Sequence, residues 1–162
     1  MHSSFKYKDG EFYIEGVSIS AIAESVGTPC YIYSYEYLKD SFTAYSEAFA
    51  STDTLICYSV KANSNLAILK AFSDLGSGYD IVSGGELLRV KRAGGDPGKV
   101  VFSGVGKTRD EMKAAIEAGI LFFNVESEEE LHVLNSVGME IGKKAPVALR
   151  VNPDIDPKTH PY

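Results

Sequence analysis

From residue 54 onward the sequence alternates between short apolar runs and longer amphipathic runs, and this alternation restricts the fold more than any other feature. The apolar runs predict five strands, at 55–60, 79–82, 99–103, 120–125 and 146–151. The runs between them predict four helices, at 64–75, 84–93, 109–118 and 128–141. A strand starts about every 20 to 26 residues, which is the spacing of βα units that build a parallel sheet.

Three of the predicted helices begin with the same local signal. A Ser or Thr is followed three residues later by Glu, which is the spacing of a capping box. In that motif the two side chains accept hydrogen bonds from N–H groups that the first helical turn leaves free. The pairs are Ser83 with Glu86, Thr108 with Glu111, and Ser127 with Glu130.

Regular βα units without a dinucleotide fingerprint favour a TIM-type (βα)8 barrel over an open doubly wound sheet. Five strands cannot close a barrel of eight, so we expect an α/β fold that is the first part of such a barrel. The strand at 146–151 is then left with an unpaired edge. Since the last residues, 158–162, read as a loop, we expect an amino-terminal piece of a larger enzyme, or one part of a clipped one.

Residues 1–34 have a different pattern. They contain a strand-like run at 12–14, a short helix at 20–26 and a second strand at 30–33 after a proline. We therefore expect residues 1–34 to belong to a β-rich second domain. Residues 35–162 are expected to form the barrel portion, beginning with a helix at 35–50.

The composition excludes several classes of protein. The net charge is -6, so the chain lacks the basic character of a protein that binds nucleic acid or an anionic membrane. It also lacks a signal-peptide run and the roughly 18 consecutive apolar residues of a membrane span. Cys30 and Cys57 have no metal-ligand spacing and are predicted to be reduced core thiols, with a disulfide between them left open. We expect a cytoplasmic protein without a bound metal.

The strongest candidate for chemistry is Lys61, in the run CYSVKANSN. If the strand alternates regularly, Cys57, Ser59 and Lys61 share one face. Lysine is almost never buried without a partner. A lysine at the carboxyl end of such a strand is either an ordinary terminal residue that reaches solvent or a Schiff-base amine at the catalytic end of a barrel. Alternation alone leaves both interpretations open.

Two further charged residues stand at strand positions. Asp80 follows Gly78 and Tyr79 and is either a solvated turn carboxylate or part of a site. Arg150 lies in an apolar strand that is predicted to be buried, so its charge requires a partner. If Lys61 and Arg150 both point into the barrel, the site is cationic and suits a phosphorylated, anionic cofactor.

Other motifs have simpler interpretations. The GKT run at 106–108 is not a phosphate loop, because that motif needs glycine where this chain has Val101. The acidic run at 126–130 is interpreted as a helix amino-terminus, where the macrodipole favours carboxylates. His132 is expected at the surface or in packing. His160, in a proline-bounded loop after the last strand, is either a site residue or an ordinary turn residue.

Together the motifs resemble one enzyme family. YSVKANSN, GYDIVSGGEL, VFSGVGKT, FNVESEEEL and LRVNPDIDPKTHPY stand in this order. From Thr28 onward the chain closely resembles the diaminopimelate decarboxylases, pyridoxal-phosphate enzymes of the alanine-racemase-like barrel class.

The resemblance implies decarboxylation of the amino acid meso-diaminopimelate to L-lysine, the last step of lysine biosynthesis, by a homodimer. It implies that Lys61 carries pyridoxal 5'-phosphate and that Asp80 and Arg150 lie beside the cofactor. Ser83, Glu86 and His160 are further candidates near the site or in the loop over it.

The family's phosphate-binding glycines and its residues that contact the pyridine ring come later than these motifs. The chain alone is therefore expected to bind the cofactor weakly or not at all and to be inactive. Two alternatives stay open, an ornithine- or arginine-type decarboxylase of the same class and a non-catalytic pyridoxal-phosphate-binding barrel. SGGEL and NPDIDPKTHPY favour the diaminopimelate branch, and residues 1–34 argue against the non-catalytic carrier.

Overall fold

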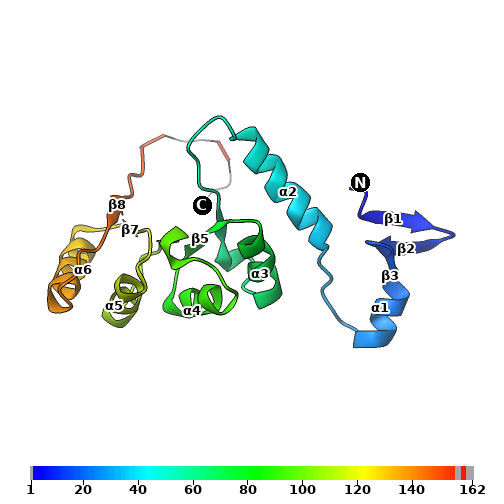
Figure 1. Ribbon diagram of the computed structural model, residues 1–162, viewed down its shortest axis with the longest axis horizontal. Helices are drawn as coiled ribbons and strands as arrows, with labels where there is room; N and C mark the ends of the chain where they lie inside the picture. The colour runs from blue at the N-terminus through cyan, green and yellow to red at the C-terminus, as the bar shows by residue number, and fades with distance from the viewer. Residues whose placement is uncertain (1, 156–157, 160–162) are drawn as a thin grey trace.

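The computed structural model describes residues 2–155 and 158–159 and contains two sheets. In the larger, parallel sheet every strand pairs with its neighbour in the sequence (Figure 1). Its strands are β4 (Cys57–Ser59), β5 (Gly78–Ile81), β6 (Val100–Phe102), β7 (Phe122–Val125) and β8 (Val147–Leu149). The helices that follow the first four strands are α3 (Leu66–Asp74), α4 (Gly84–Arg92), α5 (Arg109–Ala118) and α6 (Glu128–Glu140).

The parallel sheet has its helices on one side, as Figure 1 shows for α3 to α6. Strand side chains that face these helices form the core and are fully buried. They include Tyr79, Ile81, Val100, Phe102 and Phe123. On the opposite face Ser59, Asp80 and Asn124 are only partly buried. A doubly wound sheet has helices on both faces. Sequential strand order with one helical layer is therefore the first part of a (βα)8 barrel, as predicted.

A small antiparallel sheet and a helix precede the barrel portion. They comprise β1 (Phe5–Lys8), β2 (Glu11–Ile14), β3 (Val17–Ser18) and α1 (Ile19–Val26). Asp9–Gly10 and Glu15–Gly16 join the strands, and all four residues have positive φ, from 50° to 86°. Positive φ at both central residues is typical of the type I′ turn of a two-residue hairpin. β2 corresponds to the strand-like run predicted at 12–14, whereas β1 and β3 were not predicted.

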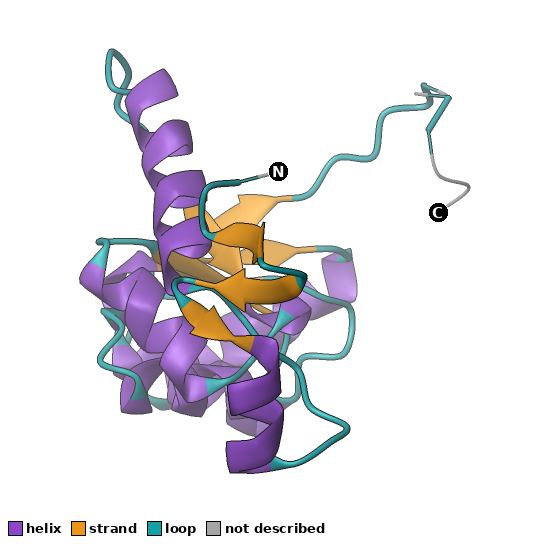
Figure 2. Ribbon diagram, turned by 90° about the vertical axis from the view of Figure 1, so that its right-hand side faces the viewer, coloured by secondary structure: helices purple, strands orange, loops and turns teal. Residues whose placement is uncertain are grey.

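The antiparallel sheet contacts α2 (Tyr35–Ala48), the helix that leads into the barrel. Figure 2 is turned towards this end of the molecule. The Glu15 carboxylate accepts hydrogen bonds from the Ser34 hydroxyl at 2.6 Å and from the Glu36 N–H at 2.7 Å, so it helps to cap α2. His2 Nε2 lies 3.1 Å from an Asp40 carboxylate oxygen. These contacts attach the small sheet to the start of α2.

The predicted strands differ from the structure by one or two residues at several ends, and three differences matter for the site and its surroundings. Residues 30–33 form no strand, because no neighbouring segment pairs with them. The strand predicted at 55–60 is limited to Cys57–Ser59, and Val60–Ala62 forms a 3-10 turn, η1. The strand predicted at 146–151 ends at Leu149, since its pairing ends with Val125 of β7.

The described residues carry neither a membrane span nor a metal cluster. None of their helices is long and apolar enough to cross a bilayer. Nor do they contain a group of three or more His, Cys, Asp or Glu side chains that could hold a metal ion.

Candidate functional site

Lys61 lies at the carboxyl end of β4, as predicted, but in the turn η1 rather than on the face of the strand. Val60 beside it is fully buried and anchors the turn, whereas Lys61 itself is exposed. The Asn63 carbonyl accepts a hydrogen bond from the Tyr58 hydroxyl at 3.2 Å, and the Asn65 side chain caps α3. The small polar residues after Lys61 therefore stop the strand and hold the lysine at its end.

The Lys61 amine has no hydrogen-bond or ion-pair partner within residues 2–155 and 158–159. Lys107 provides the contrast, because its side chain is only 1% exposed and its amine donates to three oxygens. A primary amine that is exposed and unpaired can attack a carbonyl group. Of these two lysines at the carboxyl edge of the sheet, only Lys61 is available for covalent chemistry.

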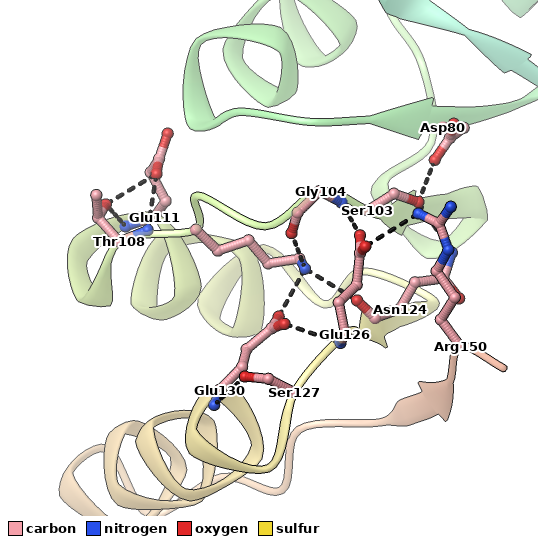
Figure 3. Close-up of polar contacts among 11 residues, drawn as sticks. Asp80, Ser103, Gly104, Thr108, Glu111, Asn124, Glu126, Ser127, Glu130 and Arg150 are labelled. Carbon is pink, nitrogen blue, oxygen red and sulfur yellow. Dashed lines mark hydrogen bonds and ion pairs between the residues drawn. The ribbon is translucent and has the colours of Figure 1, made fainter. Parts of the chain in front are cut away.

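Asp80 belongs to a hydrogen-bonded row of side chains on the inner face of the sheet, which is the face opposite the helices (Figure 3). It lies within β5 and not in a turn. Its Oδ1 accepts the Ser103 hydroxyl at 2.6 Å, and the Ser103 oxygen accepts the Asn124 amide at 2.9 Å. Its Oδ2 has a longer contact, 3.5 Å, with the Ser59 hydroxyl. One carboxylate oxygen is thus firmly held, and the other is weakly engaged.

The cysteines are both free. Burial raises the pKa of the Cys57 thiol, and the Asp80 carboxylate raises it further. Cys57 therefore lines the inner face as a protonated thiol. The prediction of two core thiols is wrong for Cys30, which is exposed because the segment around it forms no strand.

Arg150 follows β8 and is paired as predicted, although it is not buried. Its side chain is 54% exposed, and its Nη1 lies 3.0 Å from Oε2 of Glu126. The predicted burial is wrong because β8 is at the edge of the sheet, where Val147 and Leu149 are exposed as well.

Sequence reasoning missed the roles of Glu126 and Glu130. Glu126 precedes the cap of α6, and its Oε1 accepts the Gly104 N–H at 2.7 Å. Glu130 accepts the Glu126 N–H at 3.0 Å and the Lys107 amine at 2.6 Å. These two carboxylates are therefore specific partners and not simply charges at a helix end. Their spacing from the capping residue Ser127 gave no indication of Lys107.

The predicted capping boxes form in one case of three. Thr108 and Glu111 make both reciprocal hydrogen bonds. In the other two helices the Ser caps as predicted, but the Glu carboxylate bonds the N–H of the residue before the cap. The hydrogen bonds are Val82 N–H to Glu86 at 2.7 Å and Glu126 N–H to Glu130 at 3.0 Å.

The remaining candidates are Ser83, Glu86 and His160, and His132 was expected at the surface or in packing. The Ser83 hydroxyl accepts the Glu86 N–H at 3.3 Å, so both residues organise the start of α4. His132 is exposed, 3.6 Å from Glu128. His160 lies outside the described residues.

The fold defines a class, the (βα)8-barrel proteins, and this chain places an exposed lysine at the carboxyl end of a barrel strand. The family described as pyridoxal-dependent decarboxylase, pyridoxal binding domain, matches residues 36–162. The chain belongs to this family.

Its relatives include diaminopimelate decarboxylases. The chain is 57% identical to that of Pseudomonas aeruginosa, with 98% of this chain and 38% of the relative covered. It is 54% identical to that of Aquifex aeolicus, with 97% and 37% covered. The chain thus spans less than two fifths of the length of these relatives.

Solved structures of decarboxylases share the fold of this chain. The M. jannaschii diaminopimelate decarboxylase in complex with L-lysine has a TM-score of 0.92 at 42% identity, covering 98% of this chain and 38% of that one. The Helicobacter pylori enzyme with L-lysine has a TM-score of 0.85 at 45% identity, covering 88% and 36%. A Chlorella virus arginine decarboxylase, with a TM-score of 0.71 at 21% identity over 84% and 37%, shows the shared fold alone.

Proposed function

We propose that this chain supplies the pyridoxal-binding part of an enzyme that decarboxylates meso-diaminopimelate to L-lysine. The observation that carries the proposal is the free amine of Lys61 at the carboxyl edge of the sheet, in a chain of the pyridoxal-dependent decarboxylase family. The substrate is inferred from the diaminopimelate decarboxylases of 54% and 57% identity.

The residues at this edge fit pyridoxal phosphate, which presents an aldehyde and negative charge. Lys61 offers an unpaired amine for the aldehyde. Arg150 contacts Glu126 through one nitrogen and is 54% exposed, so further N–H donors of its guanidinium can face an anion. Asp80 offers a carboxylate whose Oδ2 is weakly engaged. In this proposal Lys61, Asp80 and Arg150 hold the cofactor.

Bound pyridoxal phosphate supplies the electron sink for the pair released as carbon dioxide leaves. Lys61 would hold the cofactor through its amine and could carry a proton at the edge of the sheet. The Ser103 hydroxyl orients Asp80 by its hydrogen bond of 2.6 Å and so fixes the direction of that negative charge. Arg150 would provide positive charge after β8, the last strand in the order that begins with β4.

The proposal extends to the rest of the molecule. We assign residues 1–34 to a β-rich second domain, supported by their separate antiparallel sheet. We also propose a cytoplasmic homodimer in the complete enzyme. Two free cysteines are in keeping with a reducing compartment. The exposed aromatic side chains of Tyr31, 91% exposed, and Tyr33, 52% exposed, offer surface for further protein contacts.

The test is a chimera in which residues 1–162 replace the matching segment of the Pseudomonas aeruginosa relative. Release of labelled carbon dioxide is measured from meso-diaminopimelate, L-lysine, L-ornithine and L-arginine, with the parent relative alongside. Because both proteins share one carboxyl-terminal part, any difference in preference comes from this chain.

We expect release from meso-diaminopimelate alone. Lys61→Ala should abolish it, whereas Lys113→Ala, an exposed lysine on α5, should retain it. Release from ornithine or arginine would instead assign the chain to the other branch. Cofactor binding without any release would indicate a non-catalytic carrier.

A further inference from the structure

Lys107 is a buried cation that the proposed reaction does not use. Its side chain is 1% exposed, and its amine donates to the Gly104 carbonyl at 2.6 Å, the Asn124 carbonyl at 2.9 Å and Glu130 Oε1 at 2.6 Å. An ammonium group has three N–H donors, so all of them are satisfied. Lys107 therefore holds three segments together: the loop after β6, the strand β7 and the start of α6.

A continuous series of contacts leads from Lys107 through Glu130 and Glu126 to Arg150. Figure 3 shows the part of it from Glu130 to Arg150. The second carboxylate oxygen of Glu130 accepts the Glu126 N–H at 3.0 Å. The Glu126 side chain then accepts the Gly104 N–H with one oxygen and the Arg150 guanidinium with the other. Side-chain exposure rises along the series, from 1% at Lys107 through 11% and 12% at the two glutamates to 54% at Arg150.

Lys107 also acts on the row that holds Asp80. The two carbonyls that it binds belong to Asn124 and to Gly104, the residue after Ser103. Ser103 and Asn124 are the residues whose side chains lead to the Asp80 carboxylate. Asp80 is thus linked to Lys107 through Ser103 and Asn124. Arg150 is linked to it through Glu126 and Glu130.

We propose that Lys107 is a positioning residue that sets Arg150 through Glu130 and Glu126, and Asp80 through the backbone beside Ser103. Replacing a buried ion pair by apolar residues is often neutral or stabilising, so stability alone is a weak reason for burying this charge. A buried, fully satisfied network does fix the geometry of its members. This inference rests on the proposed function, in which Arg150 and Asp80 face the cofactor.

Two substitutions interrupt the series. Lys107→Met removes the charge at similar length. Glu130→Gln keeps the shape but leaves one acceptor oxygen for two donors, so it must lose either the Lys107 or the Glu126 contact. Tyr79→Phe is the control, because it removes a buried hydrogen bond, 2.7 Å to the Leu69 carbonyl, on the helix-facing side of the sheet.

The first readout is the Kd for pyridoxal phosphate, measured on the chimera by equilibrium dialysis. We expect Lys107→Met and Glu130→Gln each to weaken binding about 10-fold, taking the lower end of what losing the hydrogen-bond partner of a metal ligand costs a metal site as the guide. Glu126→Gln should do the same, and Glu130→Gln combined with Glu126→Gln should stay near 10-fold, because both residues lie in the one series that leads to Arg150. Effects that multiply to about 100-fold, or an equal loss in Tyr79→Phe, would overturn the proposal. This cycle does not require Lys107→Met to fold.

The second readout does not depend on the cofactor. Phenylglyoxal modifies arginine side chains, and peptide mass spectrometry gives the rate at each one. Arg150 should react several-fold faster in Lys107→Met and in Glu130→Gln than in the unchanged chimera. Arg109, a half-exposed arginine paired with Glu140, is the internal reference and should not change. An unchanged Arg150 rate refutes the positioning role, whereas failure of the unchanged chimera to bind pyridoxal phosphate refutes only the proposed function.

Discussion

Gly78 is the position where a single methyl group should most disturb the strand pairing beneath the site. It lies on β5 directly opposite Cys57 of β4. A Cβ atom built at Gly78 would lie 2.6 Å from the Lys99 carbonyl oxygen and 2.7 Å from Cys57 Sγ. Favourable contacts between carbon atoms lie near 3.5 to 4.0 Å. Because the Lys99 oxygen is backbone, it cannot rotate away as the end of a side chain can.

The expected cost of Gly78→Ala follows from these contacts. Overpacking a core typically costs about 1–3 kcal/mol, and Gly→Ala recovers about 0.4–1 kcal/mol by restricting the unfolded chain. With two contacts below 3.0 Å, we expect a net loss of about 2 kcal/mol in the free energy of unfolding. For a urea dependence of about 2 kcal/mol per molar, the unfolding midpoint falls by about 1 M.

Urea unfolding followed by circular dichroism measures this shift, with Gly85→Ala as the matched control. Gly85 lies in the first turn of α4, and its Cβ would meet nothing closer than Ser83 Oγ at 3.8 Å. The same substitution should therefore raise stability there by about 0.5–1 kcal/mol. A Gly78→Ala midpoint equal to or above that of the unchanged chain would refute the packing argument.

The remaining predictions concern ionisation and thiol reactivity. Hydrogen bonds from the Ser34 hydroxyl and then the Glu36 N–H lower the pKa of Glu15 below its usual 4.5. Because the pKa of Glu15 is lower in the folded state, its contribution to the free energy of unfolding is present above pH 4.5 and is lost as pH falls through the folded-state pKa. Glu15→Gln should therefore make the free energy of unfolding depend less steeply on pH on the acid side, as measured by urea unfolding at several pH values. Burial raises the pKa of Cys57, so at pH 8 a thiol reagent should modify the exposed Cys30 first and Cys57 slowly; equal rates would contradict the burial of Cys57.

Helices and strands with a strong local signal could be predicted from sequence. The helix predicted at 109–118 coincides with α5, because apolar periodicity, a Thr108 cap with Glu111 and a terminal Gly119 all agree. The hairpin strands β1 and β3 were missed, although Asp9–Gly10 and Glu15–Gly16 carry turn residues. Their alternation is too short and too polar to stand out, and cross-strand pairing supplies what the local pattern lacks.

Only part of the candidate site could be predicted from the sequence. Lys61 could be placed at the end of its strand because a run of small polar residues follows it. The partners Ser103 and Asn124 are polar residues near the ends of apolar strands, a signal that could have been used. The Lys107 to Glu130 contact joins residues 23 positions apart, one in the loop after β6 and the other in the first turn of α6, and the register of β6 against β7 brings them together. Such contacts are properties of the sheet and not of any local segment.

The proposed attachment of pyridoxal phosphate to the Lys61 amine can be tested directly by one measurement. The chimera is mixed with pyridoxal phosphate, reduced with borohydride and digested, and the modified lysine is located by peptide mass spectrometry. We expect the cofactor on Lys61, none in Lys61→Ala, and an unchanged yield in Lys113→Ala. Cofactor fixed on Lys107, or a full yield in Lys61→Ala, would contradict the assignment of Lys61.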